Sequence, residues 1–203
     1  MSDITKLPET FKSERLKLRA FHSRDATQLA KLAGVYSVAK FTLGIPLPYS
    51  RSEAKAWIAG LPARRDQGIE HIYAICTAGA RALIGAISLA IEPEHQRIEI
   101  GYWLAEPARG NGYATEALRL LLPHIFSAGY TRIYALCFLE NLDSMRLLSK
   151  LGFIREGRLR QHIVKWDEPC DVICFGMTAA RAKRCGHGEF KSAKALAVRA
   201  QRP

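Results

Sequence analysis

The sequence predicts an α/β (α+β) fold in which helices flank a central β-sheet. Three observations predict this class: an alternating strand at residues 14–21, a pair of apolar strands at 71–76 and 82–91, and a strand that passes through a glycine-containing loop into a helix at 97–118. The 203 residues contain no internal repeat and are enough for one domain with its own hydrophobic core.

The N-terminal segments predict a strand, a helix and a loop. Leucines alternate with charged residues over 14–21, as in a strand with one buried face. Ser23 can cap a helix over residues 24–33. Residues 34–50 are interrupted by glycine and proline and are expected to form a loop. Because loops with apolar anchors often line substrate sites, Tyr49 is a candidate substrate-binding residue.

A second helix and a hairpin are expected next. Ser50 or Ser52 can cap a helix that should stop near Pro62, because proline cannot donate the helical backbone hydrogen bond. The apolar runs 71–76 and 82–91 are separated by T-A-G-A-R, which is typical of a tight connection. These two strands are therefore expected to pair as a hairpin.

The middle of the chain predicts a phosphate-binding loop. An apolar strand over 98–104 is followed by a loop with Arg109, Gly110 and Gly112, and a helix begins at Ala114. Glycines let backbone N–H groups approach a phosphate closely, and the start of a helix adds unpaired N–H donors. The six-residue pattern alone also fits an ordinary strand-to-helix turn that uses glycine for its geometry.

A second motif lies in the C-terminal half. An almost entirely apolar strand over 132–139 precedes a helix for which Asn141 is a good N-cap, and Gly152 fits the left-handed residue at its end. Residues 153–166 and 172–178 are the last predicted strands, joined by the turn D-E-P-C-D. A purely structural helix would satisfy the same pattern.

Positive charge is concentrated at the C-terminal end. The net charge is +11, and residues 180–203 hold seven basic residues against one acidic residue. We therefore divide the chain into a domain of residues 1–179 and a basic tail of residues 180–203, expected to be poorly ordered or to form a short helix. A solvated terminus and a weak electrostatic contact with RNA or the ribosome both explain such a tail.

The composition predicts a cytoplasmic protein without a membrane partner. No run approaches the ~20 apolar residues that a membrane-spanning helix needs, and the first ten residues lack the apolar segment of a signal peptide. The five cysteines are odd in number and scattered, as expected of reduced thiols rather than a disulfide framework.

Two ordered motifs carry a family resemblance. The pattern R-x-x-G-x-A runs from Arg109 to Ala114, and a pattern of Asn141, Ser144 and a closing Gly-Phe follows one apolar strand later. The chain also contains E-R-L-x-L-R and I-E-I-G-Y-W-L. Over about residues 10–178 this combination resembles the GNAT acetyltransferases, most of all their ribosomal-protein N-terminal (RimJ/RimL-like) branch. The resemblance implies a mixed, mostly antiparallel sheet splayed between two central strands, and it leaves open a monomer or a homodimer.

The resemblance also implies an acetyl-CoA site without a metal. The end of the strand before the loop would pair with the pantetheine arm of the coenzyme, and the loop N–H groups would hold its pyrophosphate. Asn141 would anchor the arm, with Ser144 near the sulfur. The residues assigned to the coenzyme in this way are Trp103, Leu104, Arg109, Gly110, Asn111, Gly112, Tyr113, Ala114, Thr115, Asn141 and Ser144.

Glu99 is the candidate general base, and Ser144 the candidate partner of the leaving sulfur. Many GNAT members carry a base carboxylate on the strand of Glu99, and partial burial would raise its pKa toward a useful value. A solvated carboxylate paired with a nearby arginine is the alternative. Leu148 stands where many members carry a tyrosine acid, so Ser144 or water is left to hydrogen-bond the sulfur. For Ser144 the alternative is a helix-capping hydroxyl.

The implied reaction is direct transfer of an acetyl group to a primary amine, for which a protein N-terminal α-amine of the ribosomal type is the favoured acceptor. Asp171 matches a recurring family aspartate beside the acceptor cleft, where a carboxylate could draw in a cationic amine. The same scaffold also serves acetylation of polyamines, amino acids and antibiotics. A non-catalytic, RNA-associated module with this fold is the alternative of a different class.

Overall fold

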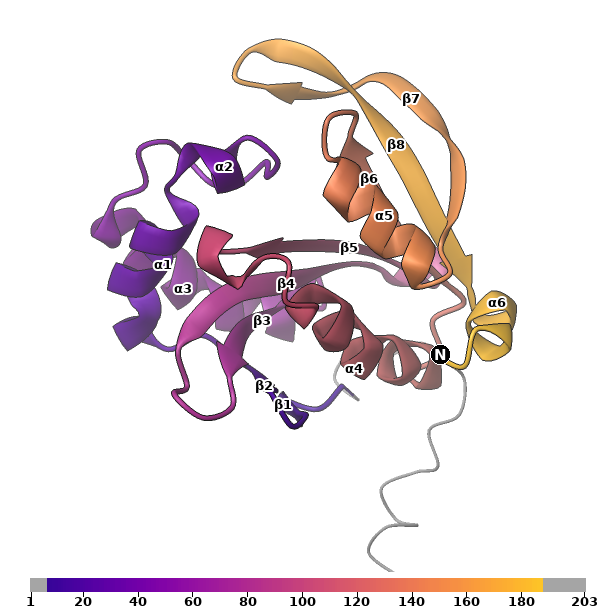
Figure 1. Ribbon diagram of the computed structural model, residues 1–203, viewed down its shortest axis with the longest axis horizontal. Helices are drawn as coiled ribbons and strands as arrows, with labels where there is room; N and C mark the ends of the chain where they lie inside the picture. Colours follow the sequence, from indigo (N-terminus) through magenta and orange to yellow (C-terminus); the bar gives the residue numbers. More distant parts are fainter. Residues whose placement is uncertain (1–6, 188–203) are drawn as a thin grey trace, which may run out of the picture.

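The computed structural model describes residues 7–187 as an eight-stranded sheet flanked by helices (Figure 1). The strand order is β1-β2-β3-β4-β5-β6-β8-β7, and every neighbouring pair is antiparallel except β5–β6. The strands are β1 (Thr10–Lys12), β2 (Leu16–Arg19), β3 (Glu70–Thr77), β4 (Leu83–Glu92), β5 (Arg97–Leu104), β6 (Arg132–Phe138), β7 (Ile154–Lys165) and β8 (Glu168–Thr178). The α-helices are α1 (Ala26–Ala33), α2 (Tyr36–Ala39), α3 (Arg51–Asp66), α4 (Tyr113–Ser127), α5 (Leu142–Lys150) and α6 (Ala179–Arg184).

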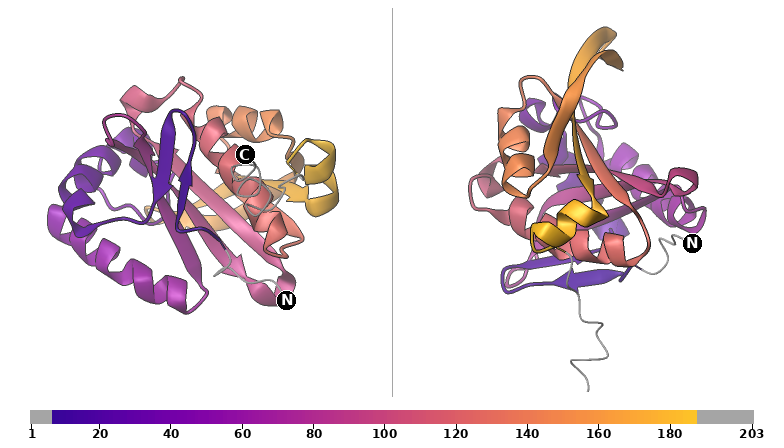
Figure 2. Two further views of the ribbon diagram at one scale, coloured as in Figure 1. Left: turned by 90° about the horizontal axis from the view of Figure 1, so that it is seen from below. Right: turned by 90° about the vertical axis from the view of Figure 1, so that its right-hand side faces the viewer.

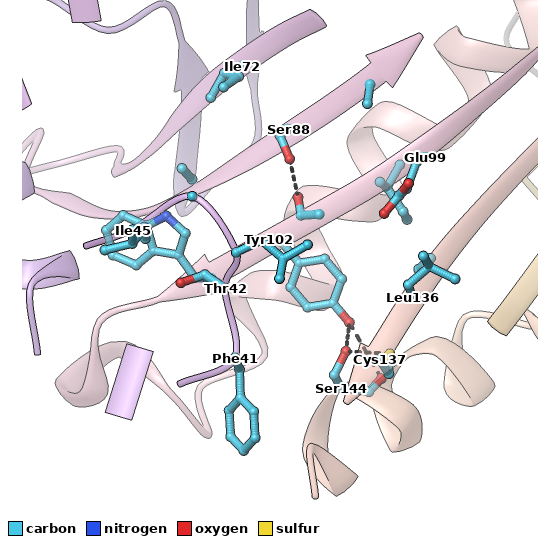
Figure 3. A pocket seen from close by; sticks show the side chains of 18 of the residues that line it. Phe41, Thr42, Ile45, Ile72, Ser88, Glu99, Tyr102, Leu136, Cys137 and Ser144 are labelled. Carbon is cyan, nitrogen blue, oxygen red and sulfur yellow. Dashed lines mark hydrogen bonds between the residues drawn. The ribbon is translucent and has the colours of Figure 1, made fainter. Parts of the chain in front are cut away.

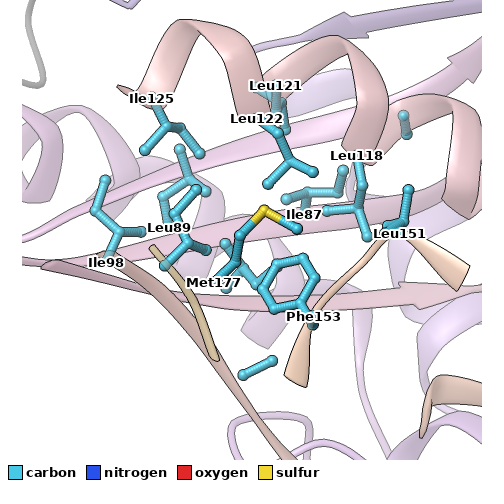
Figure 4. Close-up of a cluster of buried hydrophobic side chains, with 14 of the residues drawn as sticks. Ile87, Leu89, Ile98, Leu118, Leu121, Leu122, Ile125, Leu151, Phe153 and Met177 are labelled. Carbon is cyan, nitrogen blue, oxygen red and sulfur yellow. The ribbon is translucent and has the colours of Figure 1, made fainter. Parts of the chain in front are cut away.

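Two apolar cores cover the two faces of the sheet. Alternation along β3 assigns Tyr73 and Ile75 to one core and Ala74 and Cys76 to the other. The first core packs leucines and Ile125 of α4 against β4, β5 and β8 (Figure 4), and the second packs α1 and α3 against β3 and β4. Figure 2 shows the helices on both sides of the strands. The predicted α/β class is therefore confirmed.

The sheet divides between its two central strands. Strands β5 and β6 pair in parallel over only three residue pairs, from Arg97 with Arg132 to Glu99 with Tyr134. Beyond that point β5 stays paired with β4 up to Leu104, while β6 stays paired with β8 up to Phe138. The strands therefore diverge into the mixed, mostly antiparallel and splayed sheet that was predicted (Figure 1).

Two details of the predicted helices are wrong. Residues 23–25 form a 3-10 turn whose start is capped by the carboxylate of Asp25, which accepts the His22 N–H at 2.8 Å, rather than by Ser23. Asp25 is held there by Arg19, at 2.6 Å. The second helix, α3, is capped by Ser50 as predicted but continues through Pro62 to Asp66. In its last turn Arg64 forms an ion pair with Glu70 at 3.1 Å.

The β7–β8 hairpin is longer than predicted. Its turn is Trp166 and Asp167, both with positive φ (52° and 65°), so that the segment D-E-P-C-D mostly belongs to β8. Lys165 donates to the carbonyl of Thr42, and the Trp166 ring stacks on Tyr36 at 5.8 Å between centroids. These contacts compensate for the unfavourable turn conformation of a tryptophan. They also join the hairpin tip to the loop that contains α2, a helix that was not predicted.

Packed structure extends past residue 179. In α6, Ala182 is fully buried in the first core, and the ring of His187 lies 2.8 Å from the carbonyl of Leu151. The helix α6 thus packs against the first core. Residues 188–203, on which the expected RNA contact mainly rests, lie outside the described residues. Within residues 7–187, every helix is too short or too polar to cross a membrane.

Candidate active site

A cavity of about 410 Å³ lies where β5 and β6 separate (Figure 3). One part is lined by the diverging strand ends, from Ile100 to Trp103 and from Ala135 to Phe138, together with Asn141 and Ser144. The other part is lined by the loop 41–49, by Trp57 of α3 and by residues of β3, β4 and β7. The splayed sheet thus opens a space that reaches from the centre of the fold to its surface.

The free edge of β5 presents backbone hydrogen-bonding groups to this cavity. Ala105 donates its N–H to the carbonyl of Ile84 on the β4 side, at 2.8 Å. Because backbone groups alternate along a strand, those of Trp103 also face β4, and those of Tyr102 and Leu104 face the gap. Arg109 Nε already binds the Leu104 carbonyl at 3.1 Å. Of the two predicted strand residues, Leu104 therefore offers its N–H, while Trp103 contributes its side chain to the cavity wall.

The loop after β5 has the geometry of an anion cradle. Gly110 and Gly112 both have φ of +77°, a conformation that a residue with a Cβ rarely adopts. Within residues 7–187, no hydrogen bond uses the N–H groups of residues 110–115. The last of these residues, Ala114 and Thr115, belong to the first turn of α4. Consecutive unpaired N–H groups at a helix start favour an anion.

Side chains around the loop fix its shape. Arg109 binds the carbonyls of Leu104 and Ser37, at 3.1 and 3.0 Å, so its guanidinium has a structural role here. The Asn111 side chain donates to the Arg109 carbonyl at 3.0 Å. These three contacts tie the loop to β5, to the α2 segment and to itself.

Arg15 is a loop-side residue that the sequence reasoning missed. It binds Glu116 through Nε at 2.7 Å and the Asn111 carbonyl through Nη1 at 3.1 Å, and it lies over the Tyr113 ring at 5.0 Å. Its half-exposed guanidinium lies beside the start of α4, where it is ion-paired with Glu116. The signal was present in the E-R-L-x-L-R segment, but nothing in that segment says which distant loop the arginine meets.

Ser144 lies in a small hydrogen-bonded group inside the cavity. Asn141 caps α5 by accepting the Ser144 N–H at 3.2 Å, so Ser144 itself is not the cap. The Ser144 Oγ is 2.8 Å from the hydroxyl of Tyr102 and 3.3 Å from the Sγ of Cys137 (Figure 3). Leu148 is fully buried in the first core, away from any acid role.

Glu99 also lines the cavity, at the point where the two strands begin to diverge. Burial raises the pKa of its carboxyl above the ordinary value, and the nearby carboxylate of Glu92 adds to the rise, while Tyr134 opposes it. Arg97, the arginine on the same strand, pairs with Glu92 at 2.6 Å. Among the described residues Glu99 forms no ion pair, so the alternative of an arginine-paired carboxylate does not describe it.

The comparison with known proteins assigns the family. The model for the acetyltransferase (GNAT) domain matches residues 15–154, which include β5, the glycine loop and α5. The chain belongs to the GNAT acetyltransferases. It is therefore an acetyl-CoA-dependent N-acetyltransferase.

Individual relatives place this enzyme in the family. The uncharacterized N-acetyltransferase YoaA of Bacillus subtilis (strain 168) is 31% identical over 173 residues, which are 83% of this chain and 96% of YoaA. The ribosomal-protein-serine acetyltransferase of Escherichia coli (strain K12) is 41% identical over 81 residues, 39% of this chain and 45% of that protein.

Solved structures agree with this placement. RimL, a ribosomal alpha-N-protein acetyltransferase, superposes with a TM-score of 0.75 at 25% identity, covering 84% of this chain and 94% of RimL. A second RimL structure, 24% identical with a TM-score of 0.74 and covering 84% and 98%, contains coenzyme A in a disulfide with one of its own cysteines.

The other part of the cavity, lined by the loop 41–49 and Trp57, is mostly apolar and includes a few charged groups. Tyr49, Trp57 and the ion-paired Arg64 and Glu70 are among its lining residues. Asp171 does not line it, contrary to the expectation that it borders the acceptor cleft. Its carboxylate instead accepts from the N–H of Gln161 at 2.7 Å and pairs with Arg158, where it stabilises the irregular stretch of β7.

Proposed function

We propose that this enzyme acetylates the N-terminal α-amine of a protein by direct attack of the amine on the thioester of acetyl-CoA. The observation that carries the proposal is the single cavity that joins three features: the free edge of β5, the carboxylate of Glu99 and the hydroxyl of Ser144. The family relation to ribosomal-protein acetyltransferases supports a protein acceptor.

The residues present fit coenzyme A. The unpaired N–H groups of residues 110–115 suit its pyrophosphate, and Arg15, which is paired with Glu116, lies beside them. The free backbone groups of Tyr102 and the N–H of Leu104 suit the amides of the pantetheine arm. Asn141 borders the same cavity. When bound, the coenzyme supplies an acetyl group activated as a thioester.

Glu99 accepts the proton of the incoming ammonium, directly or through one water. An ammonium cannot attack a carbonyl, so a base at this position has a defined task. The raised pKa of Glu99, caused mainly by its burial, makes its carboxylate a better proton acceptor than a solvated one. Because the base must be ionised, kcat/KM should fall as the pH drops through that raised pKa.

The rim of the cavity favours a polypeptide acceptor. Leu43 lines the cavity and is substantially exposed. The exposed, stacked pair of Tyr36 and Trp166 does not line it but adjoins Lys165, which donates to the carbonyl of the lining residue Thr42. Apolar surface of this kind can contact the residues that follow an N-terminus, whereas a small polyamine would leave it bare.

Mass spectrometry of acetylated products tests this proposal. One peptide should have a free N-terminal serine or alanine and no lysine, and a matched peptide should have a blocked N-terminus and one internal lysine. Spermidine serves as the small-molecule acceptor. We expect one acetyl group on the first peptide at a rate far above the other two. Faster acetylation of the lysine peptide or of spermidine would contradict a protein N-terminal acceptor.

A further inference from the structure

Tyr102 bridges the two sides of the divided sheet. It lies on β5, and its hydroxyl reaches the Oγ of Ser144 at the start of α5, at 2.8 Å (Figure 3). Both residues line the cavity, and the Tyr102 ring packs against the first core. The sequence gives no indication of this contact, because 42 positions separate the two residues.

The protons of this group can be assigned by counting donors and acceptors. Tyr102 and Ser144 each have one O–H, and each hydroxyl oxygen can also accept. The other acceptor for Tyr102, the Ser144 carbonyl, is 3.5 Å away, at the limit of a hydrogen bond. Burial raises the pKa of Tyr102, so its hydroxyl keeps its proton. The short contact is therefore best satisfied when Tyr102 donates to the Ser144 Oγ.

When Tyr102 donates to the Ser144 Oγ, the direction of the Ser144 O–H is fixed as well. An Oγ that accepts from Tyr102 must point its own O–H elsewhere. Inside the group only the Sγ of Cys137, at 3.3 Å, can accept it, and a thiol sulfur is a weak acceptor. The Ser144 proton is thus available to a stronger acceptor in the cavity, such as a thiolate.

We propose that Tyr102 is a positioning residue that directs the Ser144 hydroxyl toward the sulfur of the bound coenzyme. In the transfer step, Ser144 donates a hydrogen bond to the sulfur, which keeps the electron pair of the broken C–S bond. Glu99 takes one proton from the ammonium before attack and passes it to solvent. After the nitrogen has formed the new C–N bond, Glu99 takes the second proton from that nitrogen and passes it to solvent in the same way, which leaves a neutral amide and the coenzyme thiolate. Tyr102 holds Ser144 throughout and exchanges no proton. This inference rests on the proposed coenzyme site and is independent of the acceptor.

The test is the pKa of the coenzyme A thiol when bound to the enzyme, measured from the ultraviolet absorbance of its thiolate as the pH is raised. A directed hydrogen bond to sulfur stabilises the thiolate and lowers this pKa. Tyr102→Phe should raise it by about one unit, an about tenfold loss of thiolate, which is the size of one good hydrogen bond. The kcat should fall by about tenfold, and the affinity for coenzyme A should change less than about twofold.

Two further variants make the result specific. Ser144→Ala should raise the thiol pKa by the same amount, and adding Tyr102→Phe to it should have no further effect, because Tyr102 acts through Ser144. Tyr73→Phe is the matched control, since it also removes a buried hydroxyl, one that donates to the Pro8 carbonyl at 2.8 Å outside the cavity. It should leave the thiol pKa unchanged.

The outcomes separate the two proposals. An unchanged thiol pKa in a folded Tyr102→Phe protein, or additive shifts in the double variant, would overturn the role of Tyr102 and leave the proposed function standing. A failure of the intact enzyme to bind coenzyme A would instead overturn the coenzyme site, and the inference with it. Thermal unfolding of each variant shows whether it is folded.

Discussion

The backbone groups that we assign to the coenzyme come from one contiguous stretch, residues 97–118, to which Asn141 and Ser144 are added. The acceptor half of the cavity instead gathers side chains from the loop 41–49, α3, β3, β4 and β7. The first half presents mainly backbone N–H groups, whose positions follow from a strand, two glycines and a helix start. The second half presents side chains brought together by tertiary packing. A local motif can therefore specify the coenzyme site, while the acceptor site depends on the whole fold.

Glu99 lines the cavity where β5 and β6 begin to diverge. Its substitution should have the largest effect on the rate of transfer and leave coenzyme binding intact. Glu99→Gln should lower kcat by roughly 10²–10⁴-fold, the usual contribution of a general base. The acidic limb of the pH–rate profile should disappear, because the group with the raised pKa no longer titrates. Coenzyme A affinity should be unchanged by calorimetry. Near-full kcat with an unaltered pH profile would show that Glu99 is structural.

Gly112→Val should lower the affinity for coenzyme A, which Glu99→Gln should leave unchanged. At φ of +77° a β-branched residue is strained, so the loop N–H groups should move and coenzyme A affinity should fall by at least about tenfold, ~1.4 kcal/mol. Gly79→Val is the matched control, because Gly79 lies in the β3–β4 turn, has no neighbour within 4 Å of an added Cβ and has no positive φ. Equal affinities of the two variants would contradict the assignment of the loop.

Trp166→Ala should affect only the acceptor half. It removes the stack on Tyr36 that holds the hairpin tip against the α2 loop, a contact worth ~1 kcal/mol in other proteins. We expect KM for a peptide acceptor to rise about fivefold, with coenzyme A affinity unchanged. Ile154→Ala, on the same hairpin and similarly exposed, is the control. Equal effects of the two substitutions would show that the tip has no special role.

The smallest effect is expected for Asp171→Asn. Because this carboxylate binds the Gln161 N–H and Arg158 outside the cavity, kcat and the acceptor KM should stay within about twofold. Steady-state kinetics with the same peptide measures both. A large rise in the acceptor KM would restore Asp171 to the acceptor site.

The same division explains what the sequence could predict. The strand, the loop of Gly110 and Gly112 and the Asn141 cap follow from local rules of backbone conformation, and the structure has them where they were expected. Tyr102, Arg15 and Cys137 were missed because their roles depend on partners in other elements. Asp171 was misplaced because the two-residue turn at Trp166 moved it from a loop into a strand.

The ends of the helices were also predicted less well than the motifs, because they depend on contacts with other elements. Pro62 predicts a stop when only local hydrogen bonds are counted, but α3 continues for another turn, in which Arg64 and Arg65 pair with Glu70 and Glu9. The Asp25 cap depends on Arg19, which is fixed by the sheet rather than by the helix. Such contacts between elements cannot be read from a single segment.

Amide hydrogen exchange, measured by NMR with and without coenzyme A, tests the central claim most directly. In the free enzyme the N–H groups of residues 110–115 have no partner in the described structure and should exchange quickly. Saturation with coenzyme A should slow their exchange, and that of Tyr102 and Leu104, by at least about tenfold. The N–H of Trp103, which alternation directs toward β4, should not change. Unchanged exchange at residues 110–115 in an enzyme that calorimetry shows to be saturated would contradict the account.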